Sequence, residues 1–342
     1  MSLDRYSRQV LFAGIGAEGQ EKLLSSKAVL IGCGALGTVI ANTLARAGVG
    51  SLRIIDRDFV DLTNLQRQVL FDESDVAANL PKAEAARRKI RAINSDVAVE
   101  AVVDDVDPTN VVSLVKDADV ILDGSDNFQV RYLINDAAIS LDKPWIYGAA
   151  VGSYGLSLTV RPKITPCLRC LFPAPPPAEH SPTCDSAGVL GSIIGVIASI
   201  QSVEAIKILT GQLDRLSPYL THVDVWDLSF RTLKVEGARE SSNCPACFEG
   251  RLEYLNAKTH SLATTLCGRN SVQISPAERR DLDLTALEKK LQTAGTVMRN
   301  PYLVRLSTGE HEITVFANGR AIVSGTEDTA VARTLYARWI GD

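Results

Sequence analysis

The sequence lacks an excess of charge of either sign, with 36 Lys and Arg residues against 40 Asp and Glu residues and a net charge of −4. Nucleic-acid-binding domains normally carry a strongly basic face, so we expect no nucleic-acid partner. With 46% hydrophobic and 22% charged residues, the composition also excludes a disordered chain and a fibrous repeat.

A secretory signal is also absent, because residues 1–11 carry charges where an apolar core would be needed. One uncharged run, residues 186–203, reaches the lower length limit for a membrane-spanning helix. Its Gly and Ser content, and the continuation of the helical pattern through Glu204 and Lys207, favour a buried helix instead. We therefore expect a cytoplasmic protein with no membrane partner.

Seven cysteines in 342 residues are too few for a disulfide scaffold. Four of them form two Cys-x-x-Cys pairs, Cys167/Cys170 and Cys244/Cys247. This is the spacing of two zinc knuckles, and four thiolates form a closed tetrahedral site with no open position for water. The pattern predicts a structural zinc site, with reduced, metal-free cysteines as the alternative.

The length exceeds that of a usual single domain, so we expect one large domain and a smaller one. In the first half, short apolar runs alternate with amphipathic stretches, which predicts an α/β, Rossmann-like fold with a mainly parallel sheet covered by helices. We expect strands at residues 27–32, 51–56, 98–103 and 119–122, and helices at 36–47 and 82–93.

The large domain is expected to span residues 1–252. Residues 146–160 are expected to form a further strand interrupted by glycines, and the proline-rich residues 171–187 a crossing loop. The long apolar helix follows, and residues 218–233 alternate like closing strands.

The pattern of expected helices and strands in residues 253–342 predicts a small C-terminal α+β domain. We expect helices at 285–293 and 327–340, strands at 302–306, 311–316 and 321–324, and a hairpin turn at Asn318-Gly319.

A glycine motif, Gly32-x-Gly34-Ala35-x-Gly37, directly follows the first strand and opens a helix. Such a turn lets the backbone approach a phosphate, and the helix N-terminus adds free N–H groups. Asp56 ends the next strand, where a carboxylate can bind ribose hydroxyls. The motif alone fits an NAD(P)-dependent oxidoreductase, or a turn that serves only tight packing.

Further polar residues favour phosphoryl or nucleotidyl chemistry over hydride transfer. Cations spread the charge that develops on phosphate, and a carboxylate holds magnesium. Taken singly, each residue could be a surface charge or a cap. The residues are Asp58, Asn64, Arg67, Gln68, Lys82, Asp126 and Asn127.

Taken together, these segments are specific, and the sequence resembles the MoeB/ThiF group of ubiquitin-activating-like adenylyltransferases. The matching segments are RYSRQ at 5–9, VLIGCGALG at 29–37, AGVGSLRIIDRDFVDLTNLQRQ at 47–68, PKAEAA at 81–86, LDGSDN at 122–127, TCDSAGVLG at 183–191 and both cysteine pairs.

The resemblance implies an enzyme that uses ATP to adenylate the C-terminal glycine of a ubiquitin-like sulfur carrier ending in Gly-Gly. It implies that Arg8 reaches across a homodimer into the partner's site. The remaining roles carry over by motif position: Gly32, Gly34, Ala35, Gly37, Asp58, Gln68 and Asn127 at the nucleotide, Asp56 on the ribose, Asn64, Arg67 and Lys82 on the phosphates, and Asp126 on Mg²⁺.

The nucleophile is a carboxylate, already ionised at neutral pH, so we assign no general base and leave His180 without a role. Cys184 precedes a helix, whose N-terminus lowers a thiol's pKa. The resemblance implies that this cysteine can bond to the carrier or to sulfur, with an inert thiol as the alternative. Cys267 could suggest a sulfurtransferase loop, but the C-terminal domain is too short for one.

The resemblance leaves the sulfur carrier and its pathway open, of the molybdopterin or thiamine type among others. A sulfur donor such as a cysteine desulfurase or a sulfurtransferase is a further partner. Residues 148–155 are glycine-rich, and we expect them to line the channel for the carrier's tail. The alternatives are an NAD(P)-dependent oxidoreductase and a non-catalytic scaffold of the same fold.

Overall fold

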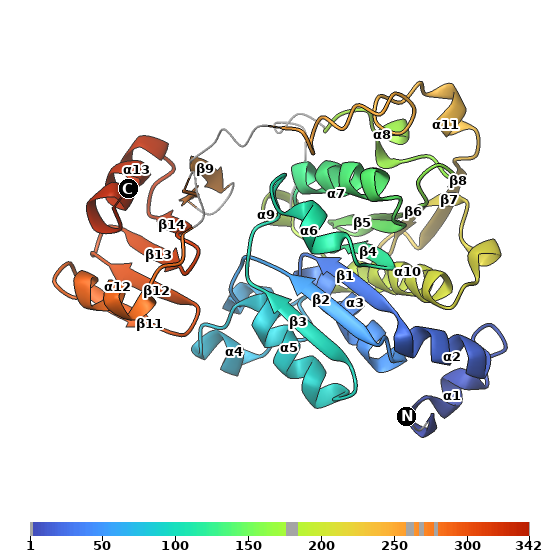
Figure 1. The fold of residues 1–342 in the computed structure, drawn as a ribbon, viewed down its shortest axis with the longest axis horizontal. Helices are drawn as coiled ribbons and strands as arrows, with labels where there is room; N and C mark the ends of the chain where they lie inside the picture. The colour runs from blue at the N-terminus through green and yellow to red at the C-terminus, as the bar shows by residue number, and fades with distance from the viewer. Residues whose placement is uncertain (1–2, 176–183, 258–262, 267–269, 277–279, 342) are drawn as a thin grey trace. The chain divides into compact units, whose positions relative to one another are not determined.

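The computed structural model describes residues 3–175, 184–257, 263–266, 270–276 and 280–341. The chain divides into two compact units, Met1–Ala257 (unit 1) and Lys258–Asp342 (unit 2). Each unit has a sheet and a hydrophobic core of its own (Figure 1).

Unit 1 is built on an eight-stranded sheet with the order β3-β2-β1-β4-β5-β6-β7-β8. Strands β3 to β5 in this order run parallel, and β5 to β8 pair in antiparallel fashion. The strands are β1 (Lys27–Ile31), β2 (Ser51–Ile55), β3 (Ala98–Val102), β4 (Val120–Asp123), β5 (Trp145–Val151), β6 (Tyr154–Val160), β7 (Tyr219–Asp224) and β8 (Ser229–Lys234).

The order of the strands reverses between β1 and β4. The chain moves outward from β1 to β2 and β3, and then returns to place β4 on the other side of β1. In open α/β sheets such a reversal leaves a crevice at the carboxyl ends of the strands, where ligands bind. The expectation of an α/β fold is therefore confirmed, and the carboxyl edge of the strands is where a ligand site is expected.

The expectation of one strand over residues 146–160 is wrong. The segment forms a hairpin in which β5 pairs with β6 from Trp145↔Val160 to Val151↔Tyr154. Gly152 between them has a φ of 58°, in the left-handed region that favours glycine, so the chain reverses there. Strand periodicity alone does not distinguish one long strand from two strands joined by a tight turn.

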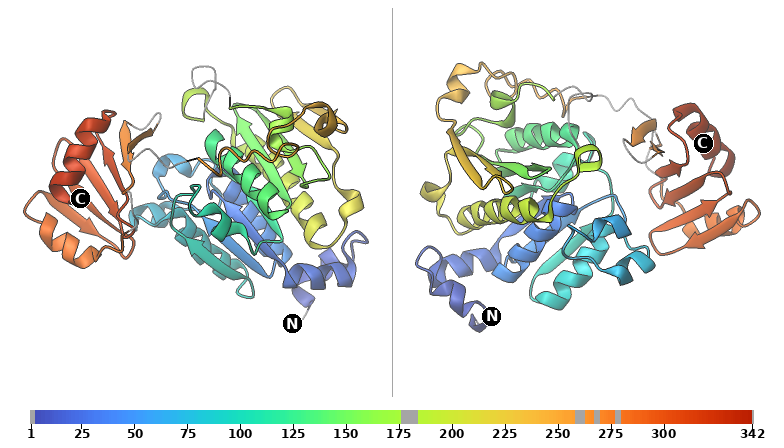
Figure 2. Two further views of the ribbon diagram at one scale, coloured as in Figure 1. Left: turned by 45° about the horizontal axis from the view of Figure 1, so that its top comes forward. Right: turned by 180° about the vertical axis from the view of Figure 1, so that it is seen from behind.

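Helices cover both faces of the sheet and enclose two cores (Figure 2). The first face carries α3 (Ala35–Ala47), α5 (Lys82–Ile93) and α10 (Gly191–Leu209), and the second carries α6 (Val111–Val115) and α7 (Phe128–Leu141). At the N-terminal end, α1 (Ser7–Val10) packs against α2 (Gly16–Ser25). The expected helices at 36–47 and 82–93 are α3 and α5, whereas the sequence did not suggest α2, α6 or α7.

Within the described part of the chain, α10 is the helix long and apolar enough to cross a membrane, by length and composition alone. Half of its apolar window is buried. It packs against α3 and against strands β5 and β6, and its residues Ile193, Ile194 and Ile197 belong to the first core. The expectation of a buried helix is confirmed, although the helix begins at Gly191 rather than at residue 186.

Unit 2 is a six-stranded antiparallel sheet with the order β11-β12-β13-β14-β10-β9, and two helices pack on its core. Gly319, with a φ of 83°, lies in the predicted hairpin turn between β13 and β14. The elements are β9 (Ala263–Leu266), β10 (Ser271–Ile274), α12 (Leu284–Leu291), β11 (Thr296–Arg299), β12 (Leu303–Ser307), β13 (Glu312–Phe316), β14 (Ala321–Ser324) and α13 (Thr329–Trp339).

Candidate active site and metal centre

Three glycines bring β1, β4 and the start of α3 into backbone contact at the reversal of strand order. A Cβ on Gly37 would lie 2.1 Å from the carbonyl oxygen of Gly32, and a Cβ on Gly124 would lie 2.4 Å from the same oxygen. Gly32 itself has a φ of 87°. The motif glycines therefore serve a close approach, and Gly124, in the loop after β4, is a third member that the motif does not reveal.

The N-terminus of α3 is left open towards this crevice. Gly34 is its N-cap and Ala35 its first residue, and no side chain caps the helix. A 13-residue helix with uncapped N–H groups presents a partial positive charge that suits an anion. Among the glycine-motif residues, Gly34 and Ala35 are thus placed to meet phosphate.

Asp56 is fixed at the end of β2 by two backbone hydrogen bonds. Its carboxylate accepts the N–H of Cys33 at 2.6 Å and that of Asp58 at 2.7 Å. Burial raises the pKa of Asp56, and Lys82 opposes this shift. Burial, followed by the charge of Asp56, likewise raises the pKa of Cys33 well above its usual value, so Cys33 stays a neutral thiol inside the turn.

Two cations lie beside these carboxylates. Lys82, the first residue of α5, is 4% exposed and places its Nζ 3.2 Å from a carboxylate oxygen of Asp58. Arg57 binds Asp105 at 2.8 Å. Burial lowers the pKa of Arg57, but the charges of Asp105, Asp58 and Asp126 outweigh that effect and raise it.

The segment after β2 returns to the glycine turn. Asn64 closes the short helix Leu62–Asn64 by accepting the N–H of Asp61 on its side-chain oxygen, and its carbonyl accepts the N–H of Gln68. Gln68 is buried, and its Nε2 would lie 3.9 Å from a Cβ on Gly34. Its Oε1 has no hydrogen-bond partner among the described residues, as expected for a side chain beside a ligand site. On the same turn, the guanidinium of Arg67 donates to the carbonyl of Thr63 at 3.0 Å.

The loop after β4 carries Asp126, which is exposed. It follows β4, which lies beside β1 in the sheet, and its charge raises the pKa of both Arg57 and Arg131. Asn127 accepts the N–H groups of Gln129 and Val130 as the N-cap of α7. In this structure the side chain of Asn127 therefore serves as the N-cap of α7.

Arg8 is not part of the site in its own chain. It is exposed on α1, and it makes no hydrogen bond or ion pair with any residue that the structure describes. Its neighbour Gln9 donates to the carbonyl of Ala47 at 2.9 Å, at the C-terminal end of α3. Because a 13-residue helix is about 20 Å long, Arg8 lies near the far end of α3 from the glycine turn.

The four cysteines of the two pairs meet on the second face of unit 1. Their Sγ atoms all lie within 4.8 Å of one another, and the separations include 3.5 Å for Cys167–Cys244 and 3.4 Å for Cys170–Cys247. Tetrahedral Zn–S bonds of about 2.3 Å require sulfurs about 3.8 Å apart. The four thiols therefore fit a metal ion, as the spacing predicts.

Cys184 begins the four-residue helix α9 (Cys184–Ala187), and its side chain lies outside the described ones. His180 and Cys267 lie outside the described residues altogether. Of the expected crossing loop, residues 176–183 are likewise outside them.

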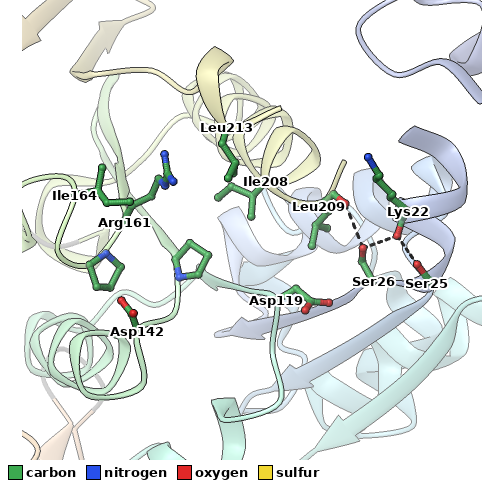
Figure 3. A pocket seen from close by; sticks show the side chains of 12 residues that line it. Lys22, Ser25, Ser26, Asp119, Asp142, Arg161, Ile164, Ile208, Leu209 and Leu213 are labelled. Carbon is green, nitrogen blue, oxygen red and sulfur yellow. Dashed lines mark hydrogen bonds between the residues drawn. The ribbon is translucent and has the colours of Figure 1, made fainter. Parts of the chain in front are cut away.

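A cavity of about 620 Å³ lies at the opposite, amino-terminal edge of the sheet. Ser26 precedes β1 there, and Asp119 precedes β4 (Figure 3). Three of its charged groups have partners in the protein: Lys22 binds Glu18, Asp142 binds Lys163, and Asp119 accepts the backbone N–H of Lys27. Far from the glycine turn, this cavity is not the nucleotide site.

The chain matches the ThiF family over residues 6–246, more than half of its length. The chain belongs to the ThiF family. This family match covers the sheet of unit 1, the glycine turn and three of the four cysteines, and it ends before unit 2.

Named relatives of this ThiF-family chain are adenylyltransferases and activating enzymes. The sulfur carrier protein ThiS adenylyltransferase of Bacillus subtilis is 44% identical over 98% of this chain and 99% of its own length. The SAMP-activating enzyme E1 of Haloferax volcanii is 41% identical over 73% of this chain and 91% of its own. Among solved structures, E. coli MccB with ATP is similar with a TM-score of 0.60 and 25% identity, covering 68% of this chain and 71% of that one.

Sequence reasoning missed Arg57, Gly124, Arg131 and Gln201, all of which lie at this edge. Arg57 stands between two carboxylates at a strand end, and Arg131 is the one cation in the sequence of α7. Both were visible signals. Gln201 gave no signal, because only the fold shows that it reaches the carbonyls of Asp123 in β4 and Ile146 in β5.

Proposed function

We propose that this protein adenylates the C-terminal glycine of a ubiquitin-like sulfur carrier that ends in Gly-Gly. A carboxylate oxygen of that glycine attacks the α-phosphorus of ATP, the bond to the bridging oxygen breaks, and pyrophosphate leaves. The products are an acyl adenylate and pyrophosphate, and no proton changes place. The observation that carries the proposal is the uncapped N-terminus of α3 at the reversal of strand order: α3 follows β1, and β1 lies between β2, whose following loop holds Lys82 through Asp58, and β4, which Asp126 follows.

The chain's own residues meet the chief demand of this reaction, which is to bring an anion to an anion. Lys82, Arg57 and Arg67 surround the phosphates with positive charge, and the N–H groups of α3 add to it. Asp56 holds the ribose, because its position at the end of β2 is fixed by two N–H groups. Mg²⁺ held by Asp126 and phosphate oxygens would neutralise charge on the phosphates.

Replacement of Asp126 tests the proposal. Asp126→Ala should abolish ATP–pyrophosphate exchange in the presence of the carrier, while circular dichroism and the unfolding midpoint stay as in wild type. The matched control is Asp214→Ala, since Asp214 is an exposed carboxylate at 80% side-chain exposure and pairs only with its neighbour Arg215 in the described part of the chain. Unchanged exchange in Asp126→Ala would refute the metal-binding role.

A carrier of the ThiS type is the first substrate to test in this exchange assay. The Bacillus relative named for ThiS matches nearly the whole of this chain, including unit 2. The Culex quinquefasciatus adenylyltransferase and sulfurtransferase MOCS3, at 41% identity, matches 71% of this chain, and that match covers 55% of its own length. A molybdopterin-type carrier is the second to offer. Binding of NAD(P)H without pyrophosphate release would instead favour the oxidoreductase alternative.

The proposed enzyme is a cytoplasmic homodimer in which Arg8 completes the partner's site. The distance between α1 and the glycine turn of the same chain supports action in trans. Arg8→Ala and Asp126→Ala should each be inactive alone, and an equal mixture of the two should regain about a quarter of wild-type exchange, because half of the dimers are mixed and each mixed dimer has one intact site. No recovery after the chains have exchanged would refute the role in trans.

Zinc is the proposed occupant of the four-cysteine site, where it ties the segment before the crossing loop to the end of unit 1. Elemental analysis should find one zinc per chain, and Cys244→Ser should lower that content together with the unfolding midpoint.

Cys184 is proposed to carry sulfur or the carrier in a later step with a cysteine desulfurase or sulfurtransferase. Cys184→Ser should keep exchange and lose thiocarboxylate formation; loss of exchange itself would refute this division.

A further inference from the structure

Strands β4 and β5 part before they reach the carboxyl edge of the sheet. Their parallel ladder pairs only Ile121 with Trp145 and Leu122 with Ile146. Beyond it, side chains take the place of strand-to-strand bonds. From the α10 side, the Nε2 of Gln201 donates to the carbonyl of Asp123 at 2.8 Å and to that of Ile146 at 3.3 Å.

Arg131 fills the same gap from the α7 side. Its Nε lies 3.2 Å from the carboxylate of Asp123, and its Nη2 donates to the carbonyls of Ser125 at 2.8 Å and Gly148 at 3.3 Å. The rings of Phe128 and Tyr147 lie 5.2 and 5.5 Å from the guanidinium carbon. The side chain is 7% exposed, so one buried cation joins the loop after β4 to β5.

Both neighbours of Asp126 are anchored. The carboxylate of Asp123 accepts the N–H and the hydroxyl of Ser125 at 2.9 and 2.6 Å, and Arg131 holds the carbonyl of Ser125. On the other side, Asn127 caps α7. Asp126 is thus an exposed carboxylate on a short loop whose ends are fixed, and Arg131 is the group that fixes this loop to β5.

We propose that Arg131 is a positioning residue that sets the place of the metal-binding carboxylate of Asp126 relative to β5. This inference rests on the proposed function, since it assumes that Asp126 binds magnesium during adenylation. A planar guanidinium reaches Asp123, Ser125 and Gly148 at once, which a lysine ammonium on a flexible stem does not do in the same geometry. Loss of a group that hydrogen-bonds a metal ligand lowers metal affinity or activity by about 10- to 100-fold. Arg131 acts on Asp126 through the neighbouring Ser125, so we expect an effect at the lower end of this range.

The test measures the Mg²⁺ concentration that gives half-maximal ATP–pyrophosphate exchange in the full-length protein with its carrier. Arg131→Lys keeps a charge beside Asp123, and the double variant Arg131→Met/Asp123→Asn removes both charges, so neither leaves an unpaired buried carboxylate. Both should raise the half-maximal Mg²⁺ concentration by about tenfold or more. A merely structural role would reduce the amount of active protein and leave that concentration unchanged.

Arg320→Lys is the matched control, because Arg320 is an equally buried arginine in unit 2, with its guanidinium over the ring of Phe316. It should leave the Mg²⁺ dependence as in wild type. An active wild type together with Arg131 variants of unchanged Mg²⁺ dependence overturns this inference alone, and so does an equal shift in Arg320→Lys. A wild type that shows no exchange at any Mg²⁺ concentration overturns the proposed function, and this inference with it.

Discussion

At the scale of single residues, the distance between α3 and the sheet is set by atoms that glycine does not have. The carbonyl of Gly32 faces the Cα atoms of Gly37 and Gly124 at separations that no Cβ can enter. This contact puts the helix N-terminus where an anion can reach it. The price is that the turn tolerates no larger residue at these two positions.

Gly37→Ala should therefore destabilise the protein by about 1–3 kcal/mol, because the added methyl overlaps backbone rather than a movable side chain. The measurement is urea unfolding followed by circular dichroism, together with ATP affinity, which should fall. Gly195→Ala is the matched control within α10, where a Cβ meets nothing within 4 Å. It should stabilise by up to about 1 kcal/mol. Equal stability of the two variants would contradict this account of the turn.

The sequence was informative at residues that stand at strand ends. Asp56 and Lys82 could be predicted because parallel strands bring their carboxyl ends to one edge, and the structure places both beside Asp58. The roles of Arg131 and Gln201 could not be assigned, since Arg131 reaches the carbonyl of Gly148 across 17 positions and Gln201 reaches that of Asp123 across 78. A contact of that kind follows from topology and has no local pattern.

At the scale of elements, one carboxylate links the two central strands of the parallel sheet. Asp117, which precedes β4, binds Lys27 at the start of β1 and Arg53 in β2. The hydrogen bond from Lys27, followed by that from Arg53, outweighs burial and lowers the pKa of Asp117 to about 2, below its ordinary value of about 3.9.

Because folded Asp117 binds its proton more weakly than the unfolded chain does, this link stabilises the fold above about pH 4 and ceases to do so as the pH falls through about 2. Asp117→Asn should therefore lower the free energy of unfolding at pH 7, and the difference from wild type should shrink between about pH 4 and pH 2. Urea titrations of both proteins across this range give the measurement. A difference that does not change with pH would show that packing, and not charge, is responsible.

Elements were predictable where their pattern is periodic. Helix α5 has an amphipathic sequence, with apolar and charged residues on different sides, and was expected at its observed bounds. Helix α7 was not expected, because eight consecutive residues, Arg131–Ala138, are buried and leave no amphipathic period to detect. The hairpin of β5 and β6 was missed because glycines also occur inside strands, so the glycines at 152 and 155 did not by themselves mark a reversal of the chain.

At the scale of the whole molecule, the active-site residues proposed above all lie in unit 1. Two cores lie within Met1–Ala257 and the third lies in unit 2. The match to the ThiF family also ends at residue 246. The catalytic residues proposed above therefore do not depend on the core of unit 2.

A chain that ends at Ala257 should fold and should keep ATP–pyrophosphate exchange within a few-fold of the full-length protein, since its cores and its glycine turn are complete. Unfolding followed by circular dichroism checks the first point, and exchange with the carrier checks the second. A folded chain without exchange would assign unit 2 a part in adenylation, for example in docking the carrier.

The packing of α10 on α3 has a consequence for how the protein is made. The two helices are separated by more than 140 residues in sequence, yet each covers the other's apolar side. During translation, α3 leaves the ribosome long before its cover exists. A nascent chain halted ahead of Gly191 should thus expose the apolar surface of α3 to chaperones. The fold should become compact only after synthesis has passed residue 209.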